Sequence, residues 1–367
     1  MFSVHPTARL RPSPYYNAVV AEGMTSASIY NRMILPTSFG DPEAEYWRII
    51  NGVSQWDVGV ERQVQLKGPD ALKLAQILSP RDLSNCQVGQ GKYVPLCNHD
   101  GVLINDPILM KLADDLVWLS IADSDIWYWA RAIGAERGLD VEISEPDVSP
   151  MAVQGPKGED VVASILGDWV RDLKYFWFRE AEIEGIPIVV CRSGWSKQGG
   201  FELFLRDGTK GSQLWNIVKE AGQPYDIGPG APATAERTES GLVSLRGDTD
   251  TQTSPYEVRL GKFVELNVPD DVVGIEALRR VASEGPPRHQ LGLIFEGDMP
   301  APLAFEWEAL FADGKRVGDM TNCVWSPRME ANIGYALLST ECKPGDHVDV
   351  ARISGTVQAK LVELPFI

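Results

Sequence analysis

The segment GIPIVVCRSGWSKQGGFELFL, residues 185–205, places two apolar runs on either side of a glycine-rich turn. Short apolar runs bounded by glycine are typical of β-strands, and a turn between two of them predicts an antiparallel hairpin. The turn carries Trp195, Ser196, Lys197 and Gln198, and the apolar run that follows carries one carboxylate, Glu202. Two interpretations stay open at this point: a hairpin with Glu202 on its solvent side, or a ligand-binding loop.

The residues on the N-terminal side of this hairpin indicate a mixed fold. Residues 60–145 predict the order β, α, β, β, β, α, β, which is typical of an α+β unit with antiparallel strands. The stretch MAVQGPKGEDVVASILG (151–167) echoes VQLKGPDALKLAQILS (64–79), because each combines a strand, a Gly-Pro turn and a helix. The fold class is therefore α+β, with two related and interleaved modules.

The C-terminal part has a different character. SEGPPRHQ (283–290) is typical of a linker, and the residues after it form short strand patterns separated by turn residues, which predicts a small β barrel or sandwich. We predict a first α+β module made of residues 1–54 and 147–282, a second made of residues 55–146, and a C-terminal β domain, residues 283–367.

Composition limits the classes of partner. The net charge of −17 and the lack of a lysine- or arginine-rich run argue against nucleic-acid binding. No apolar segment has the length of a membrane span or of a signal-peptide core, so we expect no membrane partner and a cytoplasmic protein. The five cysteines and four histidines are scattered, which predicts reduced thiols and neither a zinc site nor a disulfide framework.

Common catalytic motifs are missing from the sequence. There is no G-x-S-x-G, no P-loop and no G-x-G-x-x-G after a strand, which argues against a nicotinamide-dependent oxidoreductase. The aromatic clusters WYW (127–129) and YFWF (175–178) are interpreted as core, although exposed aromatic faces also bind flat heterocycles and cations.

Several motifs together resemble a known family. Residues 194–202, GWSKQGGFE, are similar to the G-Y-T-G-E-x-G-F-E loop of the glycine-cleavage T-protein, an aminomethyltransferase. YVPLCNHDGVLIND (93–106), RTESGL (237–242) and Ser326-Pro327 resemble further motifs of that family. ERQVQ, SPRDLS, INDP, SIADSD, VEISEPDVSP, AVQGPKG and SPYE resemble, in the same order, its dimethylsulfoniopropionate demethylase subgroup, so that the resemblance covers nearly the whole chain.

The resemblance implies a three-domain cloverleaf fold and a tetrahydrofolate-dependent enzyme. It implies transfer of a methyl group from dimethylsulfoniopropionate to tetrahydrofolate, giving 3-(methylthio)propionate and 5-methyltetrahydrofolate. By family position Glu202 would anchor the pterin, while Trp195, Tyr93 and Ser196 would complete the folate site. Asn105 and Asp106 occupy the position of two family aspartates at the reacting end of the folate, and which of the two is important stays open.

Some positions depart from the demethylase pattern. The Y-N-H-M motif of the demethylases is Tyr30-Asn31-Arg32-Met33 in this chain, so that arginine stands in place of histidine. Arg246 and Arg259 stand where the demethylase pattern has glycine, and Phe204 stands where it has tyrosine. Tyr30, Arg32 and Arg246 are therefore candidate substrate residues, because arginine pairs well with a carboxylate. Open alternatives are another anionic methyl donor (a methoxylated aromatic acid or a methylated amine) and a non-catalytic folate-binding protein. A homodimer is one option for the assembly, and no metal is predicted.

Overall fold

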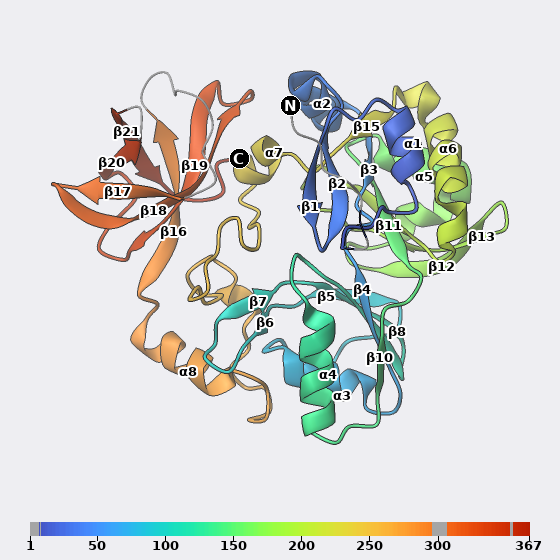
Figure 1. Cartoon of the computed structure of the whole chain (residues 1–367), viewed down its shortest axis with the longest axis horizontal. Helices are drawn as coiled ribbons and strands as arrows, with labels where there is room; N and C mark the ends of the chain where they lie inside the picture. Colours follow the sequence, from blue (N-terminus) through green and yellow to red (C-terminus); the bar gives the residue numbers. More distant parts are fainter. Residues whose placement is uncertain (1–6, 8, 296–306, 353–354) are drawn as a thin grey trace. The chain divides into compact units, whose positions relative to one another are not determined.

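The computed structural model describes residue 7 and residues 9–295, 307–352 and 355–367 (Figure 1). Contacts divide the chain into two compact units, each built from several segments. Unit 1 comprises residues 1–75, 83–93 and 107–233, and unit 2 comprises residues 76–82, 94–106 and 234–367. The helix α3 (Ala71–Leu78) runs from the first unit into the second. The three-domain boundaries stay a prediction.

Two antiparallel sheets form the frame of unit 1. The five-stranded sheet has the order β10 (Glu142–Ser144), β4 (Gln63–Lys67), β9 (Leu116–Ser120), β8 (Ile108–Ala113), β5 (Gln90–Tyr93). The six-stranded sheet has the order β12 (Phe178–Ile183), β13 (Ile186–Cys191), β14 (Gly200–Leu205), β11 (Ser149–Gln154), β3 (Ser54–Asp57), β15 (Gly228–Gly230), in which only the β3–β15 pair is parallel.

Helices and a hairpin surround these sheets. The helices are α1 (Tyr16–Ala21), α2 (Pro42–Asn51), α4 (Ile126–Glu136), α5 (Gly158–Leu166) and α6 (Gly211–Gly222), with 3-10 turns η1 (Asp168–Asp172), η2 (Gly208–Lys210) and η3 (Gln223–Tyr225). The two-stranded hairpin is β1 (Ser26–Tyr30) and β2 (Met33–Ser38). The predicted hairpin at 185–205 is confirmed as β13–β14. Residues 60–145 form the predicted α+β unit with both predicted helices, but five short strands, β5 to β9, lie between α3 and α4 where three were predicted.

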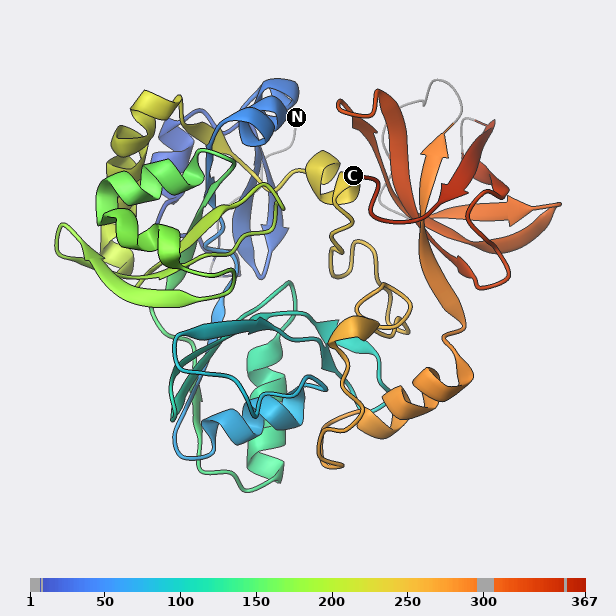
Figure 2. The ribbon, with the colours of Figure 1, turned by 180° about the vertical axis from the view of Figure 1, so that it is seen from behind.

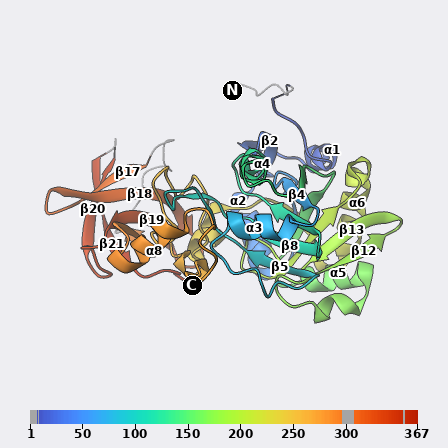
Figure 3. The same ribbon diagram turned by 90° about the horizontal axis from the view of Figure 1, so that it is seen from below.

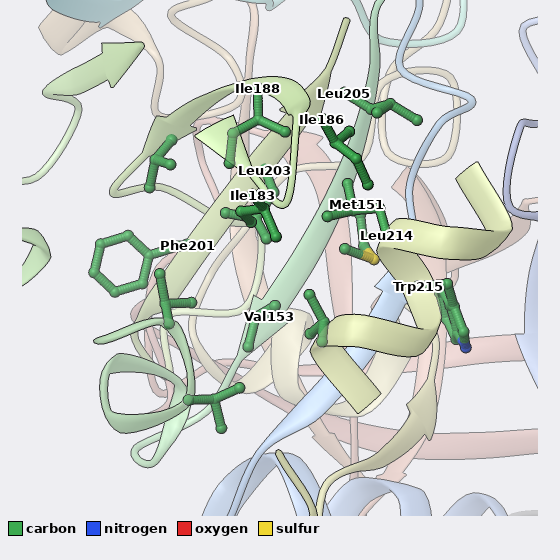
Figure 4. Close-up of a cluster of buried hydrophobic side chains, with 14 of the residues drawn as sticks. Met151, Val153, Ile183, Ile186, Ile188, Phe201, Leu203, Leu205, Leu214 and Trp215 are labelled. Carbon is green, nitrogen blue, oxygen red and sulfur yellow. The ribbon is translucent and has the colours of Figure 1, made fainter. Parts of the chain in front are cut away.

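The six-stranded sheet is covered on both faces. Alternate residues of β14 (Phe201, Leu203, Leu205) pack with Leu214 and Trp215 of α6 in one cluster, which Figure 4 shows. Helices α5 and α6 lie along this face (Figure 2). The opposite face supplies Val189, Cys191 and Phe204 to a second cluster, together with Met110 and Trp118 of the five-stranded sheet. Strand β14 is apolar at nearly every position because both of its faces are buried.

Unit 2 is built around a closed barrel, visible in orange to red in Figures 1 and 3. Its strands follow the order β16 (Arg288–Phe295), β19 (Ala331–Ser339), β18 (Lys315–Ser326), β17 (Glu308–Ala312), β20 (His347–Arg352), β21 (Gly355–Val362). The predicted barrel or sandwich is thus a barrel, because β16 pairs with both β19 and β21. The other elements of the unit are β6 (Leu96–Cys97), β7 (Leu103–Asn105), α7 (Thr234–Glu239), η4 (Gly261–Phe263) and α8 (Ile275–Glu284).

Buried carboxylates fasten α7 to the barrel. Glu239 accepts a hydrogen bond from the hydroxyl group of Ser326 at 2.6 Å and is paired with Arg328. Asp248, fully buried, is paired with Arg237 at 2.5 Å and accepts a hydrogen bond from Thr321 at 3.0 Å. Buried charges must be paired and hydrogen-bonded, so these contacts fix one arrangement of α7 on β18.

No helix in the described part of the chain combines the length and the apolar character needed to cross a membrane.

A further buried carboxylate, that of Asp57 on β3 in unit 1, has a different environment. It is 2% exposed and accepts hydrogen bonds from the Ser13 hydroxyl group and the Gly59 amide, and no cation pairs with it among the described residues. Burial raises the pKa of Asp57 to about 6, although both hydrogen bonds act in the opposite direction. A carboxyl group whose pKa is higher in the folded than in the unfolded state destabilises the fold when it ionises. This cost is absent below about pH 4, grows through pH 4 to 6, and is complete above that range.

We therefore predict that Asp57→Asn increases the free energy of unfolding at pH 7.5 by about 3 kcal/mol, and that the gain vanishes towards pH 4. Urea unfolding of both proteins across this pH range measures the difference. Asp172→Asn, at an exposed position, is the matched control and should leave the pH profile unchanged. A gain that is the same at every pH would contradict the assignment of the cost to ionisation of Asp57.

Candidate functional site

Glu202 lies in the middle of β14 and is buried. In the sheet register it stands opposite Ala152 of β11 and Cys191 of β13, and the residue is 5% exposed. It shares its face of the strand with Phe204, the face directed towards the five-stranded sheet. The interpretation of Glu202 as a residue on the solvent side of a hairpin is therefore wrong, because a second sheet covers that side.

Glu202 is desolvated and has a hydroxyl group as its hydrogen-bond partner. The Ser193 hydroxyl group donates a hydrogen bond to Oε2 of Glu202. Burial raises the pKa of Glu202 above its ordinary value, and this hydrogen bond counteracts part of the rise. Burial also raises the pKa of the Cys191 thiol, so that this neighbour stays protonated at neutral pH. The site thus holds an acceptor in a desolvated place, which suits a ligand with a hydrogen-bond donor edge.

Gln154, at the end of β11, holds the loop 193–200 in place. Its Nε2 donates to the carbonyl groups of Ser193 at 3.0 Å and Phe201 at 3.3 Å, and its Oε1 accepts from the Ser196 hydroxyl group at 2.7 Å. Ser196 is fully buried, and its hydroxyl oxygen also accepts from the Gln198 amide at 3.1 Å. The Ser196 hydroxyl group is thus engaged within the protein, and its role as a cofactor contact stays a prediction.

A short segment, residues 174–178, joins this loop to the strand that carries Tyr93. The Phe176 amide donates to the Arg192 carbonyl at 2.8 Å, and the Gly91 amide of β5 donates to the Phe176 carbonyl at 2.5 Å. Phe178 begins β12 and donates to the Gly89 carbonyl at 2.8 Å. Strand β5, which ends at Tyr93, and the hairpin that carries Glu202 are therefore connected within unit 1. Trp195 in the loop and Tyr93 are both half-buried.

The same segment supplies a residue that the sequence analysis missed. Tyr175 is 56% exposed, and its ring lies 4.3 Å from that of Phe176. Desolvation at its hydroxyl group, followed by the negative charge of Glu202, raises the pKa of Tyr175 to about 12. Interpretation of YFWF as core is correct for Phe178, which is buried, and wrong for Tyr175. An exposed aromatic ring offers a face on which a flat ligand can stack, so Tyr175 joins the candidate residues of the site.

Tyr30 and Arg32 lie at the turn between β1 and β2. Asn31 and Arg32 both have positive φ, 50° and 61°, as a tight two-residue hairpin turn requires. The Asn31 amide donates to Asp123 at 2.8 Å, and the guanidinium group of Arg32 is paired with Asp125 at 2.6 Å. The Arg32 side chain is 61% exposed. The turn is thus anchored on the segment that precedes α4.

The remaining candidate residues belong to unit 2. Asn105, at the end of β7, is fully buried, and its Oδ1 accepts from the amide of Asp106 at 3.0 Å. Arg246 is exposed, with a φ of 62°. Arg259 has a φ of 63° and donates to Gln290 at 3.1 Å and to the Gly241 carbonyl.

The positive φ values of Arg246 and Arg259 lie in a region that glycine adopts without strain, which agrees with the expectation from the resemblance that glycine stands at both positions in the family. Burial lowers the pKa of Arg259, which contacts an amide and a carbonyl group. Among the described residues, no group of three or more histidine, cysteine, aspartate or glutamate side chains is placed to hold a metal ion.

The Gln154 clamp yields a test with a matched control. Gly194 has a φ of +147°, and a Cβ there would stand 2.0 Å from Oε1 of Gln154, whereas Gly199, with a φ of +81°, has nothing within 4 Å. We predict that Gly194→Ala destabilises the fold by about 3 kcal/mol, because it displaces Gln154 and breaks its hydrogen bonds. Gly199→Ala should cost only the backbone strain, about 1 kcal/mol. Equal losses in urea unfolding would contradict the clamp.

Comparison with known proteins places nearly the whole chain in one family. Residues 15–268 match the model of the GCVT N-terminal domain, and residues 288–367 match that of the glycine cleavage T-protein C-terminal barrel domain. The dimethylsulfoniopropionate demethylase DmdA of Ruegeria pomeroyi is 40% identical, over 97% of each chain. An aminomethyltransferase of Herpetosiphon aurantiacus is 30% identical, over 90% of this chain and 91% of that protein.

A solved structure shows the same fold. The glycine cleavage system aminomethyltransferase T of Bartonella henselae superposes with a TM-score of 0.86, covering 98% of both chains at 21% sequence identity. This likeness and the closed barrel confirm the predicted α+β fold class. Both domain models match, and a relative with 40% identity spans nearly the whole chain, so the protein belongs to the glycine cleavage T-protein family.

Proposed function

We propose that this protein is a tetrahydrofolate-dependent demethylase. It transfers a methyl group from dimethylsulfoniopropionate to tetrahydrofolate and leaves 3-(methylthio)propionate and 5-methyltetrahydrofolate. The observation that carries the proposal is the 40% identity, over 97% of both chains, with a protein named dimethylsulfoniopropionate demethylase. The aminomethyltransferases among the compared relatives are 25–30% identical.

The folate site of the proposal is centred on Glu202. Pterin N–H groups form a paired donor edge, and a buried carboxylate is a strong acceptor for such an edge. Trp195 and Tyr93 supply half-buried aromatic surface, and Tyr175 supplies an exposed ring whose hydroxyl group is within electrostatic influence of Glu202. Aromatic faces of this kind suit a flat heterocycle. Ser196 contributes by holding the loop through Gln154.

The reaction requires alignment more than activation. The lone pair of N5 attacks the methyl carbon, the carbon–sulfur bond breaks, and its electron pair stays on sulfur, which gives a neutral thioether. N5 becomes positively charged and then releases its proton. A sulfonium group is already a good leaving group, so orientation of the two reactants is the main task, and orientation alone contributes up to about 7–11 kcal/mol.

The donor end of the site is assigned by family position. Asp106, with Asn105 beside it, is proposed at the reacting end of the folate, and Tyr30, Arg32 and Arg246 are proposed to contact the methyl donor. The exposed position of Arg246 supports its assignment, because arginine pairs with a carboxylate in a fork geometry. Arg32 is also exposed, but its guanidinium group is paired with Asp125, so a donor carboxylate would have to share or replace that partner. The cytoplasmic location and a homodimeric assembly stay predictions from the sequence.

A panel of methyl donors tests the proposal. Purified protein is incubated anaerobically with tetrahydrofolate and dimethylsulfoniopropionate, a methoxylated aromatic acid or a methylated amine, and 5-methyltetrahydrofolate is followed by chromatography. We expect product with the sulfonium donor alone. Turnover of another donor in its place would refute the assigned substrate, and folate binding without turnover of any donor would favour a non-catalytic protein.

Removal of the charge on Glu202 tests the folate site. We predict that Glu202→Gln weakens tetrahydrofolate binding about 100-fold while the protein stays folded, because the neutral amide loses the charge-assisted hydrogen bonds and one acceptor oxygen. Fluorescence titration of the protein tryptophans measures the affinity. Glu182→Gln, at an exposed position of β12, is the matched control and should bind as the wild type does. Unchanged affinity of Glu202→Gln would contradict this role.

A further inference from the structure

Ser193 lies in the loop that connects β13 to β14, the strand that carries Glu202. It lies two residues after the end of β13 and is 2% exposed. Its hydroxyl group donates to Oε2 of Glu202, and its carbonyl group accepts from Nε2 of Gln154 at 3.0 Å. Ser193 is thus held through its side chain on the carboxylate and through its backbone carbonyl group on Gln154.

The other groups around Glu202 donate no hydrogen bond to its carboxylate among the described residues. Strand β11 presents Ala152, strand β13 presents the Cys191 thiol, and segment 174–178 presents Tyr175. The neighbouring cation, Arg192, stacks its guanidinium group on the Phe201 ring at 5.5 Å.

The guanidinium group of Arg192 is also occupied elsewhere. It is paired with Glu159 and donates to the carbonyl groups of Arg171 and Leu173, both at 3.1 Å. Among the described residues, Ser193 is therefore the hydrogen-bond donor to the Glu202 carboxylate.

We propose that Ser193 is a positioning residue for folate, whose hydroxyl group holds Oε2 of Glu202 and so fixes the orientation in which the carboxylate accepts from the pterin. This inference rests on the proposed function, because it concerns the same folate site. A carboxylate that accepts a fixed hydrogen bond has one orientation, which lowers the cost of ordering it when the ligand binds.

The contact also sets the charge of the site. A hydrogen bond donated to a carboxylate favours its ionised form, whereas burial favours the protonated form. Without the Ser193 hydroxyl group, burial acts alone and Glu202 takes up a proton at higher pH. A protonated carboxyl group has lost part of its capacity to accept from the donor edge of the pterin. Burial keeps Cys191 and Tyr175 protonated through the acid and neutral range, so they do not titrate there.

The test measures the pH dependence of folate binding. Tetrahydrofolate is titrated anaerobically into the full-length wild type and into Ser193→Ala, Ser193→Thr and Ser196→Ala, between pH 5 and pH 8. We call the fall in tetrahydrofolate affinity towards low pH the acid limb. For Ser193→Ala we expect a roughly tenfold weaker affinity near neutral pH and an acid limb moved to higher pH by about one unit. Ser193→Thr keeps a hydroxyl group and should restore the wild-type limb. Protonation of the folate itself is common to all titrations and cancels in the comparison.

The Ser196→Ala variant distinguishes an effect on the orientation of Glu202 from an effect on the order of the loop 193–200. Its hydroxyl group contacts Gln154 rather than Glu202, so its loss should weaken binding at every pH by the same factor and leave the limb in place. A limb of Ser193→Ala that coincides with that of the wild type would overturn the inference while the folate site stands. Failure of the wild type to bind tetrahydrofolate would instead refute the proposed function.

Discussion

The burial of one carboxylate between two sheets is the constraint on which the candidate site depends. Glu202 stands on a strand whose other alternate residues pack under α6, and its own face is covered by the five-stranded sheet. An ionised group in such a place is costly unless it is hydrogen-bonded. The chain meets this requirement with a neutral hydroxyl donor, Ser193, rather than with an arginine or lysine. The carboxylate therefore keeps its capacity to accept from a ligand, which a salt bridge within the protein would occupy.

The loop 193–200 serves the same purpose. Gln154 reaches from the neighbouring strand and binds Ser193, Ser196 and the backbone of Phe201, so that the ends of the loop are held at fixed positions beside Glu202. In unit 2 buried ion pairs hold α7 on the barrel in a comparable way. Two sequence motifs that are far apart, RTESGL and Ser326-Pro327, meet where Ser326 donates to Glu239. Family motifs here include residues that hold the structure together as well as those assigned to ligands.

Local sequence patterns predicted most helices and strands, because the spacing of apolar residues within a short stretch differs between the two. The hairpin at 185–205, the α+β character of residues 60–145 and the C-terminal β domain followed from such patterns, although five strands rather than three lie between α3 and α4. Properties that depend on tertiary packing could not be predicted. Whether Glu202 faces solvent depends on a second sheet formed by distant residues, and Tyr175 is exposed although its neighbours Phe176 and Phe178 are partly or fully buried. Backbone conformation was equally hidden: Arg32, Arg246 and Arg259 all adopt positive φ, which single-sequence patterns do not indicate for arginine.

Transfer of a labelled methyl group tests the central claim most directly. Dimethylsulfoniopropionate deuterated in both S-methyl groups is incubated anaerobically with tetrahydrofolate and an excess of enzyme, and the folate product is analysed by mass spectrometry. The account predicts 5-methyltetrahydrofolate that carries one fully deuterated methyl group, together with an equal amount of 3-(methylthio)propionate. Consumption of the donor without label in the folate, or a folate product bearing an unlabelled one-carbon unit, would contradict it.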